Sequence, residues 1–124
     1  MDNVAIAKAL FAALSAHDDA AVRSLCSPDL RLSQNNGPVL DLETMLGFNN
    51  AVGAVVKEMA YYDEIRDATP TGFVEEHNVK GTMLDGTEFT IAACVVGEVA
   101  DGKITEMREY FDTASASALI AALS

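Results

Sequence analysis

The chain has 124 residues, half of them apolar, and its 8 Lys and Arg residues against 19 Asp and Glu residues give a formal net charge of −11. This charge argues against nucleic acid and anionic membrane surfaces as partners, because both are bound through Lys and Arg side chains. The apolar content also excludes an intrinsically disordered chain. We therefore expect one folded, acidic domain that spans residues 1–124 and needs neither a disulfide nor a metal to fold.

The two cysteines, Cys26 and Cys94, lie far apart in the sequence and outside any CxxC spacing. We expect both to be buried free thiols, because an unpaired cysteine packs like a small apolar side chain, and such thiols suit a reducing compartment. The chain does not start with a basic segment followed by an apolar run, and no stretch approaches 18 apolar residues. The expected location is the cytoplasm.

Apolar residues at helical spacing predict two helices at the start of the chain. The first covers residues 3–16, and Asn3 can serve as its N-cap. Asp18 or Asp19 can cap a shorter second helix, which ends before Pro28.

A third, longer helix follows a short alternating segment at residues 30–32 and a turn at residues 35–38. Asp41 caps this helix, and Glu43 lies in its first turn, where a negative charge is favourable. Its apolar face consists of Met45, Phe48, Val52, Val55, Val56 and Met59.

After residue 60 the apolar period changes from that of a helix to that of a strand. The predicted strands cover residues 60–68, 72–83, 87–100 and 103–112. Asp85-Gly86 and Asp101-Gly102 join consecutive strands, and an Asp-Gly dipeptide between alternating segments is typical of a hairpin. An alanine-rich helix at residues 113–123 closes the chain. Helices followed by an antiparallel meander indicate the α+β class.

The strand at residues 87–100 is apolar on both of its faces, which is unusual for an antiparallel strand with one side in water. One face carries Phe89, Ile91, Ala93 and Val95, and the other carries Ala92, Cys94 and Val96. The helices can cover only one of them. We therefore expect a homodimer in which a second copy covers the other face of the sheet.

The order of these elements, together with Asp101-Gly102-Lys103-Ile104 leading to Arg108-Glu109-Tyr110-Phe111-Asp112, resembles the NTF2-like superfamily of cone-shaped α+β domains. That superfamily includes ketosteroid isomerases, SnoaL-like polyketide cyclases and limonene-epoxide hydrolases. The resemblance covers nearly the whole chain and implies N-terminal helices packed on a curved antiparallel sheet that encloses an apolar pocket. The superfamily contains both enzymes and non-catalytic domains, so the fold alone does not give the chemistry.

Combined with strand alternation, the resemblance implies which side chains face the pocket. The inward residues are Met107, Glu109 and Phe111 on the last strand, Ile91, Ala93 and Val95 on the strand before it, Val74, Glu76 and Asn78 on residues 72–83, and Gln34 beneath the mouth. Arg108, Tyr110 and His77 fall on the opposite face, although a shift of one residue would reverse the assignment of His77.

The residues of a ketosteroid isomerase site are not matched. The resemblance places Gln34 where those enzymes have an aspartate base, Leu10 where they have a tyrosine, and Val95 near their second aspartate. That chemistry is therefore not expected here.

A limonene-epoxide hydrolase site is matched at one position of three. Glu109 replaces one aspartate, whereas Asn78 stands for the other and Glu76 for the arginine. SnoaL-like cyclases require only a base and a hydrophobic pocket, which this sequence can supply.

Glu76 and Glu109 are the candidate catalytic pair. Two carboxyl groups in one poorly solvated pocket cannot both ionise cheaply, so they would share a proton and suit general acid/base work. The alternative is that one or both face solvent or pair with Arg66 or Arg108.

Other polar side chains would bind the substrate. Asn78 and Gln34 are expected to orient it by hydrogen bonds, and Tyr61 or Tyr62 must face inward at the pocket rim, of which we select Tyr62. The spacing of the histidines and acidic residues predicts no metal site, and no nucleotide fingerprint is present, so no cofactor is expected.

We expect a SnoaL-like pocket protein for a small hydrophobic or polyketide-like ligand, which catalyses proton transfer, cyclisation or hydration. The alternative is a non-catalytic ligand-binding or dimerisation module on the same fold.

Overall fold

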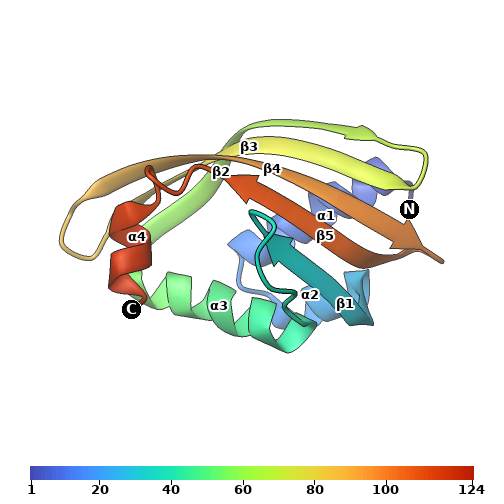
Figure 1. Cartoon of the computed structure of the whole chain (residues 1–124), viewed down its shortest axis with the longest axis horizontal. Coiled ribbons are helices and arrows are strands. Elements are labelled where there is room, and N and C mark those ends of the chain that lie inside the picture. Colours follow the sequence, from blue (N-terminus) through green and yellow to red (C-terminus); the bar gives the residue numbers. More distant parts are fainter.

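The computed structural model describes all 124 residues, and its framework is a curved five-stranded sheet (Figure 1). The strands are β1 (Cys26–Gln34), β2 (Val56–Ala68), β3 (Gly72–Met83), β4 (Glu88–Ala100) and β5 (Lys103–Phe111), and the helices are α1 (Asn3–Ser15), α2 (Asp19–Leu25), α3 (Leu42–Val55) and α4 (Ser117–Ala122). The strand order is β1-β5-β4-β3-β2, with β1 parallel to β5 and every other pair antiparallel. The predicted α+β class is confirmed.

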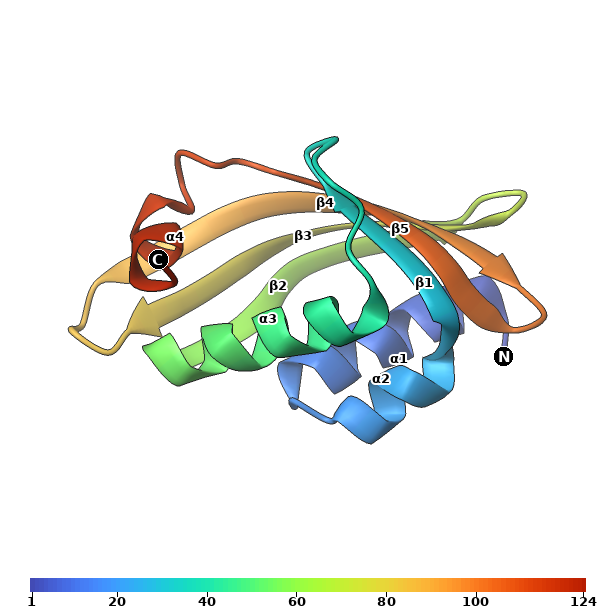
Figure 2. The ribbon, with the colours of Figure 1, turned by 60° about the horizontal axis from the view of Figure 1, so that its bottom comes forward.

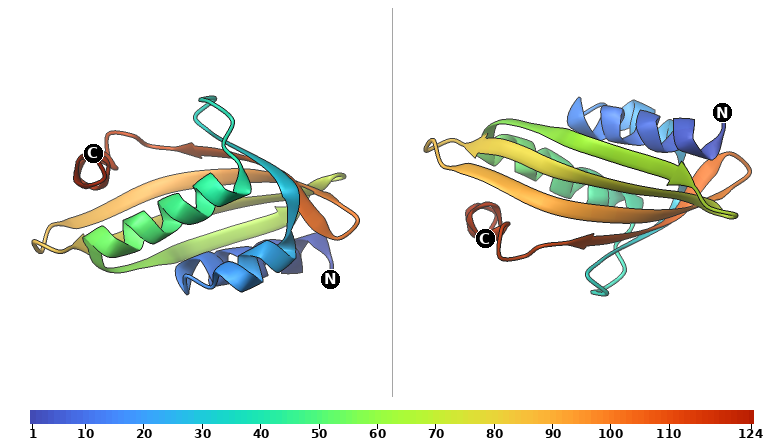
Figure 3. Two further views of the ribbon diagram at one scale, coloured as in Figure 1. Left: turned by 90° about the horizontal axis from the view of Figure 1, so that it is seen from below. Right: turned by 90° about the horizontal axis from the view of Figure 1, so that it is seen from above.

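The three longest helical segments, α1, α2 and α3, lie on one face of the sheet (Figure 2). Figure 3 shows them in front of the strands from below and behind the strands from above. We call the face toward these helices the inner face and the opposite one the outer face. The curved sheet and the helices form the cone that the resemblance implied. None of the four helices combines the length and the apolar character needed to cross a membrane.

Each long helix starts at an aspartate whose side chain accepts a backbone N–H of the first turn. Asp2 caps α1 through Ala5, so the cap lies one residue before the predicted Asn3. Asp18 caps α2, and Asp41 caps α3 through the Thr44 N–H at 2.8 Å, as predicted.

The predicted boundary between the third helix and the following strand is wrong. Helix α3 ends at Val55, and β2 begins at Val56 rather than at residue 60. Val56 and Met59 continue the helical spacing of α3, but they pack against the smaller apolar cluster from the strand. Two consecutive β-branched valines favour extended backbone, which explains why the helix ends there.

Two apolar clusters hold the inner face to the helices. The larger one joins α1, α2 and α3 to the middle of the sheet and includes Phe73, which is fully buried. The smaller one joins α4 and the end of α3 to β3 and β4 through Val52, Met83, Phe89, Ile91, Ala116 and Leu119. The sheet is therefore covered at both ends of its inner face.

Both cysteines are free thiols, as predicted. Cys26 is buried and Cys94, on the outer face, is only partly so. Burial raises the pKa of the Cys26 thiol to about 11, with Lys103 acting in the opposite direction. Cys26 is therefore a packing residue rather than a nucleophile.

Candidate active site

A cavity lies between the helices and the inner face of the sheet, in two adjoining chambers of about 120 Å³ and about 90 Å³. The residues common to both chambers are Gln34, Phe48, Asn49, Tyr61 and Glu109. Most of the other lining side chains are apolar. The polar groups are therefore concentrated where the chambers meet, which is the arrangement of a small-molecule site.

Seven of the predicted site residues lie on the wall of this cavity. They are Gln34, Glu109, Met107, Phe111, Ile91, Ala93 and Val95. Those on β4 and β5 alternate with outward residues as the apolar pattern indicates.

Glu109 on β5 is paired with Gln34 on the neighbouring strand β1. The Gln34 side-chain Nε2 donates a hydrogen bond of 2.9 Å to Oε1 of Glu109. Burial raises the pKa of the Glu109 carboxyl, while the Gln34 hydrogen bond and the nearby His77 partly oppose that rise. A buried carboxyl that keeps its proton to higher pH is suited to general acid/base chemistry.

The predicted orientation of β3 is wrong. Phe73, Glu75 and His77 are buried, whereas Glu76 between them is exposed and Asn78 is only partly buried. Directly opposed residues share a face of the sheet, and it is Glu75, not Glu76, that pairs with the inward Val95.

The β3–β4 loop explains this error. A two-residue loop at Asp85-Gly86 would place Glu76 opposite Val95. The observed loop holds one more residue, because Met83 pairs with Thr87 through a 2.7 Å hydrogen bond and Gly86 adopts a φ of 92°. Each additional loop residue moves every side chain of the strand to the other face.

The predicted pair of Glu76 and Glu109 is therefore not formed. Asn78 lies on the outer face, where its Nδ2 donates to Asp63 at 2.9 Å. Asn78 therefore does not line the inner cavity, where it was expected to orient a ligand.

Tyr62, selected as the inward tyrosine, is also on the outer face and 48% exposed. Tyr61 takes the inward position and lines both chambers. Burial raises the pKa of the Tyr61 hydroxyl far above its usual range, with Glu109 and Glu75 adding to the effect. Tyr61 therefore remains a hydrogen-bond donor at any physiological pH.

Asn49 on α3 is the remaining polar residue of the cavity wall. Its Nδ2 donates to the backbone carbonyl of Leu14 at 3.0 Å and contacts Nδ1 of His17 at 3.2 Å. With the amide nitrogen occupied, the amide oxygen is the atom that a ligand can reach.

The reversed orientation of β3 brings a carboxylate and an imidazole inward, which the sequence analysis missed. Glu75 is fully buried, and its carboxylate accepts hydrogen bonds from Nε of Arg66 at 2.7 Å and from Nδ1 of His77 at 2.6 Å. Counting residue pairs outward from the predicted turn at residues 69–72 places Arg66 opposite Glu75. This pairing of an arginine with a glutamate was the signal in the sequence that could have identified Glu75.

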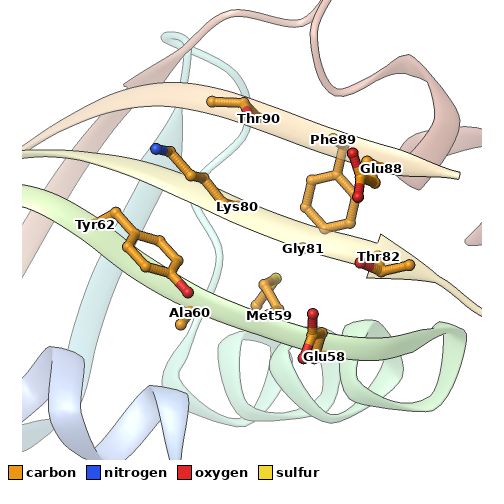
Figure 4. Close-up of a pocket in the computed structure, with 10 residues that line it drawn as sticks. All are labelled: Glu58, Met59, Ala60, Tyr62, Lys80, Gly81, Thr82, Glu88, Phe89 and Thr90. Carbon is orange, nitrogen blue, oxygen red and sulfur yellow. The ribbon is translucent and has the colours of Figure 1, made fainter.

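A second hollow of about 420 Å³ lies on the outer face over β2, β3 and β4 (Figure 4). Figure 4 shows Tyr62, Lys80 and Thr90 along it, on three neighbouring strands. The charged residues at this hollow, Glu58, Lys80 and Glu88, are all exposed. The inner cavity, in contrast, holds a partly buried carboxyl among apolar side chains, and it is therefore the candidate active site.

Solved structures share this fold over nearly their whole length. IdmH, a proposed polyketide cyclase from Streptomyces antibioticus, is 19% identical, with a TM-score of 0.85 over 98% of this chain and 99% of that one. A proposed polyketide cyclase from Pseudomonas putida is 20% identical, with a TM-score of 0.82 over 93% and 95%. A Catenulispora acidiphila protein with a ketosteroid isomerase-like fold, in complex with trimethylamine, is 17% identical, with a TM-score of 0.78 over 92% and 90%.

No curated protein matches the chain by sequence. The profile of the SnoaL-like domain, however, matches residues 7–107, which is most of the chain. The match agrees with the cone-shaped fold and with the cavity on its inner face. The resemblance to the NTF2-like superfamily is thereby confirmed, and the chain belongs to the SnoaL-like domain family.

Proposed function

We propose that this protein catalyses proton transfer on a small, mainly hydrophobic carbonyl compound of the polyketide type, with Glu109 as the general acid or base. The observation that carries the proposal is a carboxyl group in an apolar cavity, oriented by Gln34 and with its pKa raised by burial. An enolate formed in this way can close a ring or return a proton, so cyclisation and isomerisation share this first step.

The cavity limits the size of the substrate. Its chambers of about 120 Å³ and about 90 Å³ are smaller than the roughly 300 Å³ or more that holds a drug-sized ligand. A molecule of one or two rings fits this space better than a steroid or a tetracyclic polyketide.

Glu109→Gln is expected to lower the rate of α-proton exchange by roughly 10²- to 10⁴-fold, because Gln keeps the shape and the Gln34 contact but cannot transfer a proton. The measurement is the incorporation of deuterium into 2-tetralone, a bicyclic aromatic ketone, followed by NMR in heavy water. Glu106→Gln on the outer side of the same strand is the matched control, and it should keep the wild-type rate. A Glu109→Gln variant as active as the control would overturn the proposal.

The same variant is expected to be more stable than the wild type at neutral pH. Burial raises the pKa of Glu109 in the folded protein above its ordinary value of 4.5. The folded state therefore binds this proton more tightly than the unfolded state, and the stabilisation that the proton gives is lost as pH rises through the folded-state pKa. Gln cannot ionise, so the variant keeps this stabilisation. Its free energy of unfolding should exceed that of the wild type by about 1.4 kcal/mol for each pH unit between the folded and unfolded pKa values. Urea unfolding at neutral pH and below pH 4.5 measures this gain, which should vanish in acid; an equal gain at both would contradict the assignment.

We also propose that the protein is a homodimer through the outer face of the sheet. An outer patch of Ile65, Ala92, Cys94 and Tyr110 has no helix over it, and Ile65 is 65% exposed. Ala92→Arg is expected to convert the dimer to a monomer in light scattering, because it places a charge in the apolar contact. Leu84→Arg, in the β3–β4 loop, is the control. A wild-type protein that is monomeric at high concentration would refute the proposal.

A further inference from the structure

The buried chain of Arg66, Glu75 and His77 ends on a nitrogen without a partner. Arg66 binds the carboxylate of Glu75, and that carboxylate accepts Nδ1–H of His77. The other ring nitrogen, Nε2, is buried and forms no hydrogen bond. A buried nitrogen without a hydrogen-bond partner destabilises the folded state, so its presence in a native fold calls for a ligand.

His77 lies directly behind the wall of the cavity. Its ring contacts Phe11 at 5.0 Å and Tyr61 at 4.6 Å between ring centroids, and both aromatic residues line the chamber of about 90 Å³. For a ligand to reach the imidazole edge from that chamber, the Tyr61 ring must turn aside.

The register of the sheet places His77 and Glu109 on the same inner face, two strands apart and on either side of β4. His77 pairs with Ala93, which pairs with Phe111, and Glu109 is the next inward residue of β5. Neighbouring strands lie about 4.8 Å apart, so the two side chains are separated by two strand spacings with Ala93 between them. The short side chain of Ala93 lines the cavity and leaves that space to a ligand.

We propose that Nε2 of His77 is the base that removes a proton from the substrate, that Glu109 is the acid facing it, and that Glu75 and Arg66 are positioning residues for His77. This inference rests on the function proposed above. His77, which is buried on the inner face, then replaces the exposed Glu76 as the partner of Glu109 in proton transfer.

The hydrogen bond from Nδ1–H to Glu75 fixes the tautomer of His77, since a neutral imidazole carries one proton and leaves the lone pair on Nε2. Nε2 takes the proton from a carbon next to the substrate carbonyl. The electron pair of that C–H bond forms the C=C bond of the enol, and the carbonyl oxygen takes the proton of the Glu109 carboxyl. The products are an enol, an imidazolium and a carboxylate, and the reverse steps at the same or another carbon restore the enzyme without any oxidant or reductant.

The arrangement also narrows the substrate class. Base and acid lie on either side of Ala93, so the substrate must direct an acidic C–H toward one group and the oxygen of the adjacent carbonyl toward the other. A cyclic ketone with an activated methylene group meets this requirement, and 2-tetralone is the probe of that chemistry.

His77→Asn separates the proposed role from a structural one. The Asn side-chain NH₂ can replace Nδ1–H as a donor to Glu75, but nothing replaces Nε2. We expect His77→Asn to lose roughly 10²-fold or more in deuterium incorporation into 2-tetralone, with a melting temperature close to that of the wild type. Thr90→Asn, exposed on the outer side of β4, is the control. A folded His77→Asn variant within twofold of the wild-type rate, beside an inactive Glu109→Gln, would overturn this inference and leave the proposed function intact, whereas an active Glu109→Gln would overturn both.

A second measurement uses the wild-type protein and does not depend on the folding of any variant. The ¹⁵N spectrum of the His77 ring should show a protonated Nδ1 and an unprotonated Nε2, and 2-tetralone should shift the Nε2 signal. A proton on Nε2 of the neutral ring, or an Nε2 signal unaffected by saturating 2-tetralone, would overturn the assignment even if the ketone did not turn over.

Discussion

Arg66→Met is expected to lower the free energy of unfolding by about 3–5 kcal/mol, because it leaves a buried carboxylate without its cation. Glu75 is fully buried, and Arg66 is the only permanent cation that contacts it. Met has nearly the length of the Arg stem, so the loss comes from the charge rather than from a void. Chemical denaturation of the two proteins at neutral pH measures the difference.

Two further variants show whether the unpaired charge is the cause. Arg66→Met combined with Glu75→Met removes both charges and should recover most of the stability, since apolar residues often replace a buried ion pair without loss. Arg23→Met breaks an ion pair with Glu43 that lies in solvent, and it should leave the unfolding midpoint nearly unchanged. If Arg66→Met were as mild as Arg23→Met, the carboxylate of Glu75 would have to be solvated in the native protein.

The sequence predicted the faces of β4 and β5 correctly because the larger apolar side chains of β4 recur at alternate positions, and the resemblance placed Met107, Glu109 and Phe111 on one face of β5. Only one register buries Phe89, Ile91, Ala93 and Val95 together. Glu109 follows from the same alternation on its own strand. The class of fold and the carboxyl of the site could therefore be read from local pattern and resemblance.

The orientation of β3 could not be read in the same way. Phe73 and Val74 are both apolar and Glu75 and Glu76 are both acidic, so either face of the strand carries one of each. The orientation of β3 is determined by a single additional residue in the β3–β4 loop, where Gly86 adopts a left-handed conformation. One loop residue therefore decides whether the second acidic group of the sheet is exposed or lies behind the cavity beside a histidine.

The α3–β2 boundary failed for a related reason. Val56 and Met59 are three residues apart, which fits one face of a helix that continues, and a register shift of β2 between Val56 and Glu58 lets both pack on the same cluster from the strand. Only packing against α4 and the ends of β3 and β4 distinguishes the two. Side chains that satisfy two patterns are assigned by their tertiary contacts.

Phe73→Ala is expected to destabilise the protein by about 3–5 kcal/mol, the cost of removing a fully buried aromatic ring and leaving a void. Its ring lies against the backbone of Gly97, where a Cβ atom would lie 2.2 Å from Cζ of Phe73. Gly97 therefore has no side chain that could move into the space. The void would adjoin Glu75, two residues along the same face of β3.

Phe48→Ala is the matched control for this loss. Phe48 is 45% exposed at the cavity wall, so the same truncation should cost far less stability and should enlarge the cavity instead. Denaturant unfolding midpoints compare the two, and deuterium incorporation into 2-tetralone separates packing from chemistry. A Phe73→Ala variant as stable as Phe48→Ala would mean that the sheet closes over the void. Because β3 carries Glu75 and His77, that closure would move both side chains and reduce the exchange rate even in a well-folded protein.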